Sequence, residues 1–408
     1  MLFTENQERV IQDGVKWFRN SSEQIFEIDG EAGTGKSVCL YEIVRRLGLR
    51  AYQYMPMAYT GQASIIMRLK GFPHARSIHS SLYRLEKIPK MYGKTEQVKI
   101  NTTFNTGEYT YNFRPLTTEE FPSDVDLMVI DEGYMPPEYM RQDILKHGRK
   151  VLVAGDSGQL PPIGGAPAFL TGYGIHHLTE LMRQAKDNPI IYIAHRARHG
   201  DPIHLGLYGD KVLVIGEDEL TNDMVLNIQN IICGTNKTRD FINNKKRQLL
   251  GFTTQLPQYG ERLICRDNNW NVEEENIALA NGLSGVVASP YSINSFNGKS
   301  FNIDFLPDLL QTPFRDLEVD YEYLISPYNV RKQMKSEKFG ATQAWKTNGN
   351  KFEFAYALTT HLSQGAEYSN GIYYEEFLRS NIQNQLNYTG ITRFKNRMIY
   401  VKKLKKFY

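Results

Sequence analysis

The chain has 408 residues, of which 41% are hydrophobic and 23% charged, with 32 Gly and 17 Pro. These values are typical of a folded globular protein of about two to four domains, and they exclude collagen-like, low-complexity and mostly disordered chains. Lys plus Arg exceed Asp plus Glu by only 48 to 45, so a nucleic-acid function has to be argued from motifs rather than from net charge.

Neither a membrane nor an oxidising environment is indicated. No apolar run approaches the ~20 residues that span a bilayer, and the polar start MLFTENQERVIQDG lacks a signal peptide's apolar stretch. The three cysteines, Cys39, Cys233 and Cys265, are far apart and show no CxxC spacing, which argues against disulfides and a zinc site. We expect a reducing, cytoplasmic location.

The front half of the chain shows the rhythm of a buried parallel sheet. Short apolar runs are separated by stretches that can form helices, as in α/β proteins. The runs lie at 25–28, 51–57, 127–130 and 151–154.

The first apolar run leads into GEAGTGKS, residues 30–37, which precedes the helix-compatible VCLYEIVRRL. This is a complete Walker A pattern in its required context, and it predicts a site for ATP and Mg²⁺. Lys36 is expected to reach the β- and γ-phosphates and Ser37 to bind Mg²⁺. The alternative, a glycine-rich turn that only starts a helix, is disfavoured by the Lys-Ser pair. Backbone contacts to phosphate are expected from Gly30, Glu31, Ala32, Gly33, Thr34 and Gly35.

The segment 94–115 predicts a β-hairpin. Alternating apolar and polar residues flank the turn signal Asn105-Thr106-Gly107, as in hairpins. Phe104 borders that signal and is expected near the tip, where its ring is either exposed or packs on Tyr109 across the hairpin.

The next two runs end in polar residues that suit a P-loop. Asp131 follows the third run and is expected to hold Mg²⁺ through water, while Glu132 could polarise the attacking water. The fourth run leads into GDSGQLPPIGG, residues 155–165, in which the amide of Gln159 could sense a γ-phosphate. Ordinary turn chemistry is the alternative for this last segment.

The back half predicts a second α/β layer, so that a cleft would lie between two domains. Between the apolar runs, 281–305 has turn signals at Asn281-Gly282 and Asn297-Gly298 and is interpreted as an inserted β module. The runs of this half lie at 225–233, 352–358, 371–374 and 398–401.

Taken together, these motifs resemble those of superfamily 1 helicases, most closely the 1B branch of the RecD and phage Dda type. GDSGQLPP resembles motif III, LTELMRQ motif IV with Arg183, YALTTHLSQGAEY motif V, and YTGITRFKNRMIYV motif VI with Arg393. FTENQ resembles the element whose glutamine, here Gln7, reads adenine, while AYTGQAS and SIHSSLY resemble motifs Ia and Ib.

The resemblance implies an α/β fold with two RecA-like parallel-sheet domains that bind ATP between them. It places Lys36, Ser37, Asp131, Glu132 and Gln159 on one side, with Arg393 and Arg183 completing the γ-phosphate cage. Gly365 and Glu367 would lie at the ribose. Contacts to nucleic acid are implied for Tyr59, Thr60, His79, Phe104, Thr359, His361 and Ser363.

Three departures from the family pattern concern contacts to DNA. Tyr59 stands where motif Ia usually has proline, Gly133-Tyr134 follow the acidic pair, and Leu362 stands where motif V often has lysine. None of them removes a catalytic group.

The resemblance also implies a domain plan. Domain 1A is expected at 1–185, with a β-hairpin insertion 1B at about 86–120, and domain 2A at 186–271 and 346–408. An SH3-like β-rich insertion, 2B, is expected at 272–345.

The function these motifs imply is an ATP-dependent DNA helicase that moves 5′ to 3′ on single-stranded DNA. Expected partners are single strands, duplex junctions and replication or recombination proteins, but not membranes, and the compact length resembles phage members, hence the host cytoplasm. Two alternatives stay open: an RNA helicase of the same superfamily, or a non-catalytic nucleic-acid-binding scaffold with a relic P-loop.

Overall fold

The structure is a computed structural model. Among the residues it describes, no helix is both long and apolar enough to cross a membrane. The described residues are 3–89, 104–106, 109–182, 187–289, 295–336, 349–378 and 382–403.

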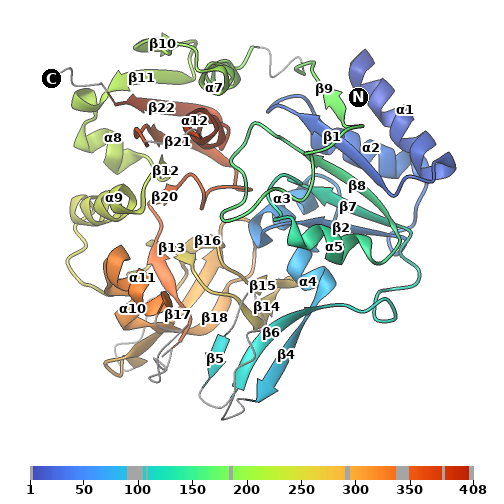
Figure 1. Ribbon diagram of the computed structural model, residues 1–408. Helices are drawn as coiled ribbons and strands as arrows, with labels where there is room; N and C mark the ends of the chain where they lie inside the picture. Colours follow the sequence, from blue (N-terminus) through green and yellow to red (C-terminus); the bar gives the residue numbers. More distant parts are fainter. Residues whose placement is uncertain are drawn as a thin grey trace. The chain divides into compact units, whose positions relative to one another are not determined.

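The chain forms two compact units, each assembled from segments that are distant in the sequence (Figure 1). We call the first the two-sheet unit and the second the β-rich unit, and we describe each by itself. The two-sheet unit comprises Met1–Arg76, Ser123–Thr253 and Ala355–Tyr408, and the β-rich unit Ser77–Pro122 and Thr254–Phe354.

The first six-stranded sheet contains all four apolar runs predicted in the front half. Its pairings β2–β7, β7–β8, β8–β1 and β1–β9 are parallel, so their carboxyl ends meet at one edge. In order across the sheet, the strands are β3 (Arg76–Ser77), β2 (Tyr54–Ala58), β7 (Leu127–Asp131), β8 (Lys150–Gly155), β1 (Ile25–Gly30) and β9 (His176–Leu178).

Helices α1 (Glu5–Asn20) and α2 (Lys36–Leu47) cover one face of this sheet, beside β1 and β8 in Figure 1. Because side chains alternate along a strand, every second residue faces them, for example Phe26 and Ile28 of β1. Thr4 starts α1 with a capping box to Gln7. The other helices of this region are α3 (Gly61–Leu69) and α5 (Tyr139–Leu145).

A second six-stranded sheet lies in the same unit, so the predicted α/β class with two parallel-sheet layers is confirmed. All its pairings are parallel except that of β10 with β11. In order, the strands are β10 (Gly206–Tyr208), β11 (Val212–Gly216), β22 (Phe394–Lys402), β21 (Tyr368–Tyr374), β12 (Ile231–Cys233) and β20 (Ala357–Thr359).

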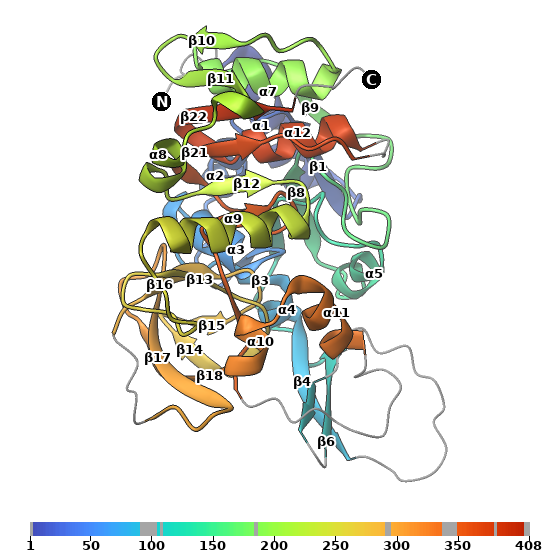
Figure 2. The ribbon, with the colours of Figure 1, turned by 90° about the vertical axis from the view of Figure 1, so that its left-hand side faces the viewer.

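Helices cover both faces of the second sheet. Ile372 of β21 packs in the cluster with α8 (Asn222–Asn227) and α9 (Asn236–Leu249), which Figure 2 shows on the viewer's side. The neighbouring Tyr373 points the other way, against α12 (Gln383–Ile391), which contacts α7 (Pro189–His199). The predicted run 225–233 is therefore part helix and part strand.

The β-rich unit contains a five-stranded antiparallel sheet that includes chain outside the predicted insertion 272–345. Both β13 and β19 pair here rather than in the second parallel sheet. At the predicted turns, Gly282 and Gly298 have φ of 91° and 83°, as tight turns favour. The strands in order are β18 (Phe314–Asp320), β17 (Ser300–Pro307), β16 (Ser284–Val287), β13 (Arg262–Cys265) and β19 (Phe352–Phe354).

The predicted run 352–358 is thus two strands in two different sheets, β19 and β20. Periodicity identifies a strand but not the sheet that it joins. The unit also contains the two-stranded pair β14 (Asn269–Glu274) and β15 (Ile277–Leu279) and the helices α4 (Ile78–Leu82), α10 (Tyr321–Ile325) and α11 (Tyr328–Ser336).

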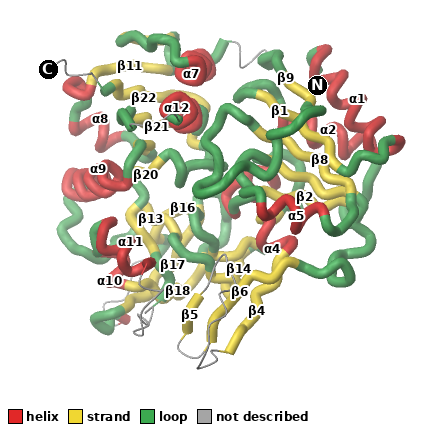
Figure 3. Tube along the Cα trace, in the orientation of Figure 1, coloured by secondary structure: helices red, strands yellow, loops and turns green. Residues whose placement is uncertain are grey.

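A three-stranded antiparallel sheet lies where the hairpin was predicted, with β6 (Tyr109–Pro115) between β4 (Tyr83–Pro89) and β5 (Phe104–Thr106), as Figure 3 shows. Residues 94–103, 107 and 108 of the predicted hairpin lie outside the described residues. In the register, Phe104 opposes Tyr111, and Thr106 opposes Tyr109. Phe104 is therefore not opposite Tyr109, because β5 continues to Thr106.

The core of the first sheet gives a stability prediction. Leu152 in β8 is fully buried, whereas Leu207 in β10 is 69% exposed. Leu152→Ala should cost about 2–5 kcal/mol of unfolding free energy through the cavity it leaves, and Leu207→Ala about 0.5 kcal/mol or less. Urea unfolding of both variants measures the difference; equal midpoints would contradict the assigned core.

Candidate nucleotide-binding site

The segment GEAGTGKS forms the loop between β1 and α2. Gly35 caps the helix with φ of 87°, in the left-handed region that side chains disfavour. The backbone N–H of Ala32 donates to the Tyr388 hydroxyl at 2.7 Å. Local structure thus agrees with the strand, loop and helix that the Walker A pattern requires.

The polar side chains of this loop and of the end of β7 converge. The Ser37 Oγ donates to the Asp131 Oδ2 at 2.8 Å. The Lys36 Nζ donates to the carbonyl oxygens of Gly30 and Glu31 at 2.6 and 3.1 Å and lies 3.8 Å from the Asp156 Oδ2. Two hard oxygen ligands side by side fit Mg²⁺, which takes few protein ligands when substrate phosphates supply others.

Glu132 lies directly beyond β7 in an unusual conformation and environment. Its φ of 55° is in the left-handed region, a strained backbone often found at functional sites. Burial raises the pKa of its carboxyl and the neighbouring Asp131 carboxylate adds to this, while Arg393 and Lys36 oppose it. A carboxyl with a raised pKa is suited to accept a proton near neutral pH.

Gln159 follows β8 and is buried, with 5% exposure. Its Oε1 has no hydrogen-bond partner among the described residues. Buried amide oxygens are rarely left unpaired, so the Gln159 Oε1 is available to accept a hydrogen bond from a ligand or water.

A pocket of about 690 Å³ brings these groups together with residues of the second sheet. Arg393, which precedes β22, donates to the carbonyl oxygens of Thr389 and Ala366 at 3.1 and 3.3 Å. The predicted site residues along this pocket are Ala32, Gly33, Gly35, Lys36, Ser37, Asp131, Glu132, Gln159, Glu367 and Arg393.

Two further predicted nucleotide contacts are placed differently. Gln7 is buried with its amide used twice, accepting from Thr4 N–H and donating to Thr34 O at 2.8 Å. Gln7 therefore holds the phosphate loop against α1 and does not line the pocket. Gly365 packs against Thr60 and Ala63 at the start of α3, so it does not lie along the pocket either.

Glu367 lines the pocket but is paired with lysines. Its carboxylate forms ion pairs with Lys395 and with the Lys70 Nζ, the latter at 3.1 Å. The same Lys70 Nζ lies 3.5 Å from the Ser37 Oγ. No sequence motif marks Lys70, because it caps the C-terminus of an ordinary helix, α3, that only the tertiary fold brings to the phosphate loop.

Three of the seven residues expected to contact nucleic acid are engaged or uncharged within the fold. Thr359 and Ser363 are buried, and their hydroxyls bond to the turn after β20. Burial lowers the pKa of His79 to about 4, so this ring, which lies 5.3 Å from Tyr83, is uncharged at neutral pH. The contacts of these three residues with nucleic acid stay predictions.

The remaining expected residues are compatible with contacts at a surface. Tyr59, Thr60 and His361 are half-buried, and Thr60 caps α3 by accepting from Ala63 N–H at 3.1 Å. Burial lowers the pKa of His361 and raises that of Tyr59. Arg183 lies outside the described residues, and for Phe104 only the strand register is given.

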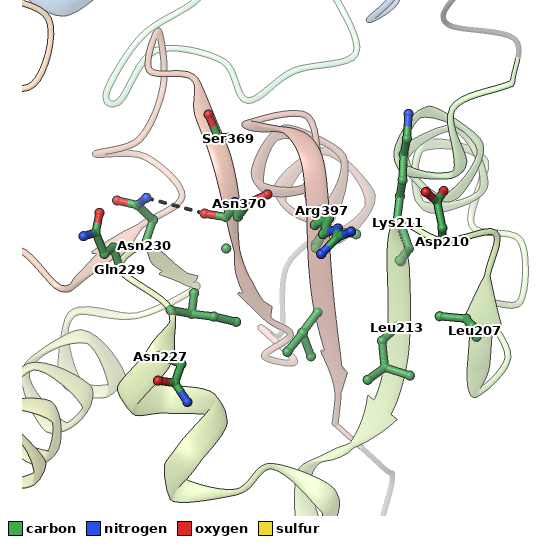
Figure 4. A pocket seen from close by; sticks show the side chains of 15 residues that line it. Leu207, Asp210, Lys211, Leu213, Asn227, Gln229, Asn230, Ser369, Asn370 and Arg397 are labelled. Atoms are coloured by element: carbon green, nitrogen blue, oxygen red, sulfur yellow. Dashed lines mark hydrogen bonds between the residues drawn. The ribbon is translucent and has the colours of Figure 1, made fainter.

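A second pocket, of about 520 Å³, lies on the second sheet (Figure 4). Arg397 of β22 and Lys211, which precedes the neighbouring β11, lie along it, together with Asn230 and Asn370, whose contact of 3.5 Å is drawn there. None of the predicted site residues lines it. The nucleotide function therefore rests on the first pocket.

Geometry and sequence together define a P-loop nucleotide site in a two-sheet α/β chain. Residues 4–218, more than half of the chain, match the model of the AAA domain family. The chain belongs to this family.

One curated relative is the ATP-dependent RecD2 DNA helicase of Deinococcus radiodurans, which is 28% identical over 291 residues. The match covers 68% of this chain but only 36% of that helicase, so the chain spans about a third of its relative's length.

Solved structures of Pif1 helicases share the fold. One, described for DNA unwinding at forked double-stranded DNA, has 16% identity and a TM-score of 0.56, covering 100% of this chain and 94% of that one. The Candida albicans Pif1 helicase has 16% identity and a TM-score of 0.53, with coverage of 99% and 95%. The predicted superfamily 1B resemblance is confirmed; a phage origin stays a prediction.

The phosphate loop gives a binding prediction. Lys36→Ala removes the cation expected at the phosphates, and ATP affinity should fall about tenfold or more, as for a lost charged hydrogen bond. Lys16→Ala, which removes an exposed lysine of α1, is the control and should bind normally. Titration with a fluorescent ATP analogue measures both; unchanged binding by Lys36→Ala would contradict the site.

Proposed function

We propose that this chain is an ATP-dependent DNA helicase that moves 5′ to 3′ on single-stranded DNA. The observation that carries the proposal is the single pocket shared by Lys36, Ser37, Asp131, Glu132, Gln159 and Arg393, which come from loops of both parallel sheets. The RecD2 match and the Pif1 fold support DNA as the nucleic acid along which the protein moves. The intact set of charged groups argues against a relic P-loop.

In the proposed reaction each group has a separate task. Lys36 binds the phosphates, and Glu132 takes a proton from the attacking water. Arg393 stabilises the charge on the transferring phosphoryl oxygens, a role worth ~10³–10⁵ in rate in related NTPases. Mg²⁺, held by Ser37 and through water by Asp131, would neutralise charge between the β- and γ-phosphates.

Arg393 lies just before β22 of the second sheet, and Lys36 lies just after β1 of the first sheet. In the proposed reaction, turnover therefore requires the two sheets to be close enough for both side chains to reach the same phosphate. This supports alternate tightening and loosening of two grips on a strand. We assign the first layer to domain 1A and the second to domain 2A, with the hairpin sheet as 1B and the five-stranded sheet as 2B. We also propose that Phe104 of the hairpin sheet stacks on the last base pair of a duplex and so helps to separate its strands.

Partly duplex DNA with one single-stranded tail tests the function. Unwinding is expected with ATP from a 5′ tail and not from a 3′ tail, because 1B relatives move in that direction. Single-stranded RNA in a parallel ATPase assay tests the alternative track. Unwinding from the 3′ tail alone would overturn the direction, and stimulation by RNA alone would favour the RNA helicase.

The raised pKa of Glu132 predicts the pH dependence of turnover. A base acts only when deprotonated, so ATPase activity should rise with pH through a value above the ~4.3 of an ordinary Glu. Glu132→Gln should bind ATP but lose about 10²-fold or more in turnover together with this pH step. A variant with normal DNA-stimulated turnover would exclude Glu132 as the base.

A further inference from the structure

The second residue of the phosphate loop is a carboxylate that points away from the phosphate site and toward the second sheet. The Glu31 Oε2 lies 3.0 Å from the His195 Nε2, and its Oε1 lies 3.2 Å from the Arg198 Nε. Both partners belong to α7, and the Glu31 side chain is only 25% exposed. The phosphate loop is thus joined to a helix on the far side of the pocket.

The partner Arg198 is itself fixed by a second carboxylate. Its Nη1 donates to the Asp156 Oδ1 at 2.8 Å, and its guanidinium lies 5.3 Å from the Tyr388 ring centroid. The Tyr388 hydroxyl donates to the other Asp156 oxygen at 2.5 Å. One arginine therefore connects Glu31 with Asp156.

The backbone beneath Arg198 is shaped for it. A Cβ at position 158 would lie 1.9 Å from the Arg198 Nη1, so any side chain there would displace the guanidinium from this position. Glycine at this position of GDSGQLPP lets the guanidinium lie directly on the turn after β8. The Arg198 guanidinium is therefore packed against the backbone of this turn.

Electrostatics explain why Glu31 needs these partners. A carboxylate in a phosphate-binding loop repels the incoming phosphates unless a cation neutralises it. The close approach of the His195 imidazole lowers the pKa of Glu31, with further contributions from Arg198 and His199. The charge of Glu31 is thus balanced by α7 and not by the loop.

We propose that Glu31 is a positioning residue that holds the phosphate loop against α7 and so couples ATP turnover to the contact between the two sheets. The proposal rests on the proposed function and deepens it. Loss of the contact should slow catalysis more than it weakens nucleotide binding, because Lys36 and the loop amides remain.

Steady-state ATPase assays with DNA test the coupling. Glu31→Ala and His195→Ala should each lower kcat about tenfold, as for a charged hydrogen bond, with a smaller change in KM. Exchange of the pair in the double variant Glu31→His with His195→Glu should recover part of the loss. Arg196→Ala on the same helix, whose side chain bonds to Pro202 O, is the matched control and should behave as the parent.

Hydrogen exchange of the phosphate-loop amides gives a readout that needs no ATPase activity. Faster exchange is expected in Glu31→Ala and His195→Ala and parent-like exchange in the control. If the parent protein shows no ATP turnover, the proposed function is wrong, but hydrogen exchange still tests the contact between Glu31 and α7. Parent-like kcat in Glu31→Ala, no recovery in the exchanged pair, or unchanged exchange would overturn the inference.

Discussion

The carboxylate of Asp156 is the group on which the arrangement of the site depends. It is completely buried, and a buried carboxylate is tolerated only when hydrogen bonds and cations replace water. Its partners are Gly158 N–H in its own turn, Arg198, Tyr388 and, at 3.8 Å, Lys36. Because these come from both sheets, satisfying this one charge brings the phosphate loop, α7 and α12 to the same place.

Residues whose positions follow from local spacing were predictable from the sequence. Lys36 and Ser37 begin the helix after β1, and Asp131 ends β7, so parallel strands alone bring them to one edge. Tyr388 and Lys70 could not be assigned in this way, because they lie in α12 and at the end of α3, and the strand pattern does not predict how these helices pack. Gln7 was expected to read adenine, but its amide caps α1 and donates to Thr34 O in the phosphate loop.

Strand identity was likewise easier to predict than strand partnership. The run 352–358 is apolar except for Glu353, yet Phe352–Phe354 joins an antiparallel sheet and Ala357–Thr359 a parallel one. The run 225–233 begins within a short helix, α8, whose N-cap is the Thr221 hydroxyl, and only its last three residues form the strand β12. Both differences arise from tertiary pairing and capping, which an apolar pattern does not encode.

Gly133, one of the departures from the family pattern, fills no catalytic role but is confined by its neighbour. A Cβ there would lie 2.2 Å from the Val153 Cγ1, and its N–H donates to Ala154 O at 2.8 Å. A side chain at position 133 therefore fits only if the side chain at position 153 is smaller or moves away. The glycine after the acidic pair is thus required by the close packing of β7 against Val153 of β8.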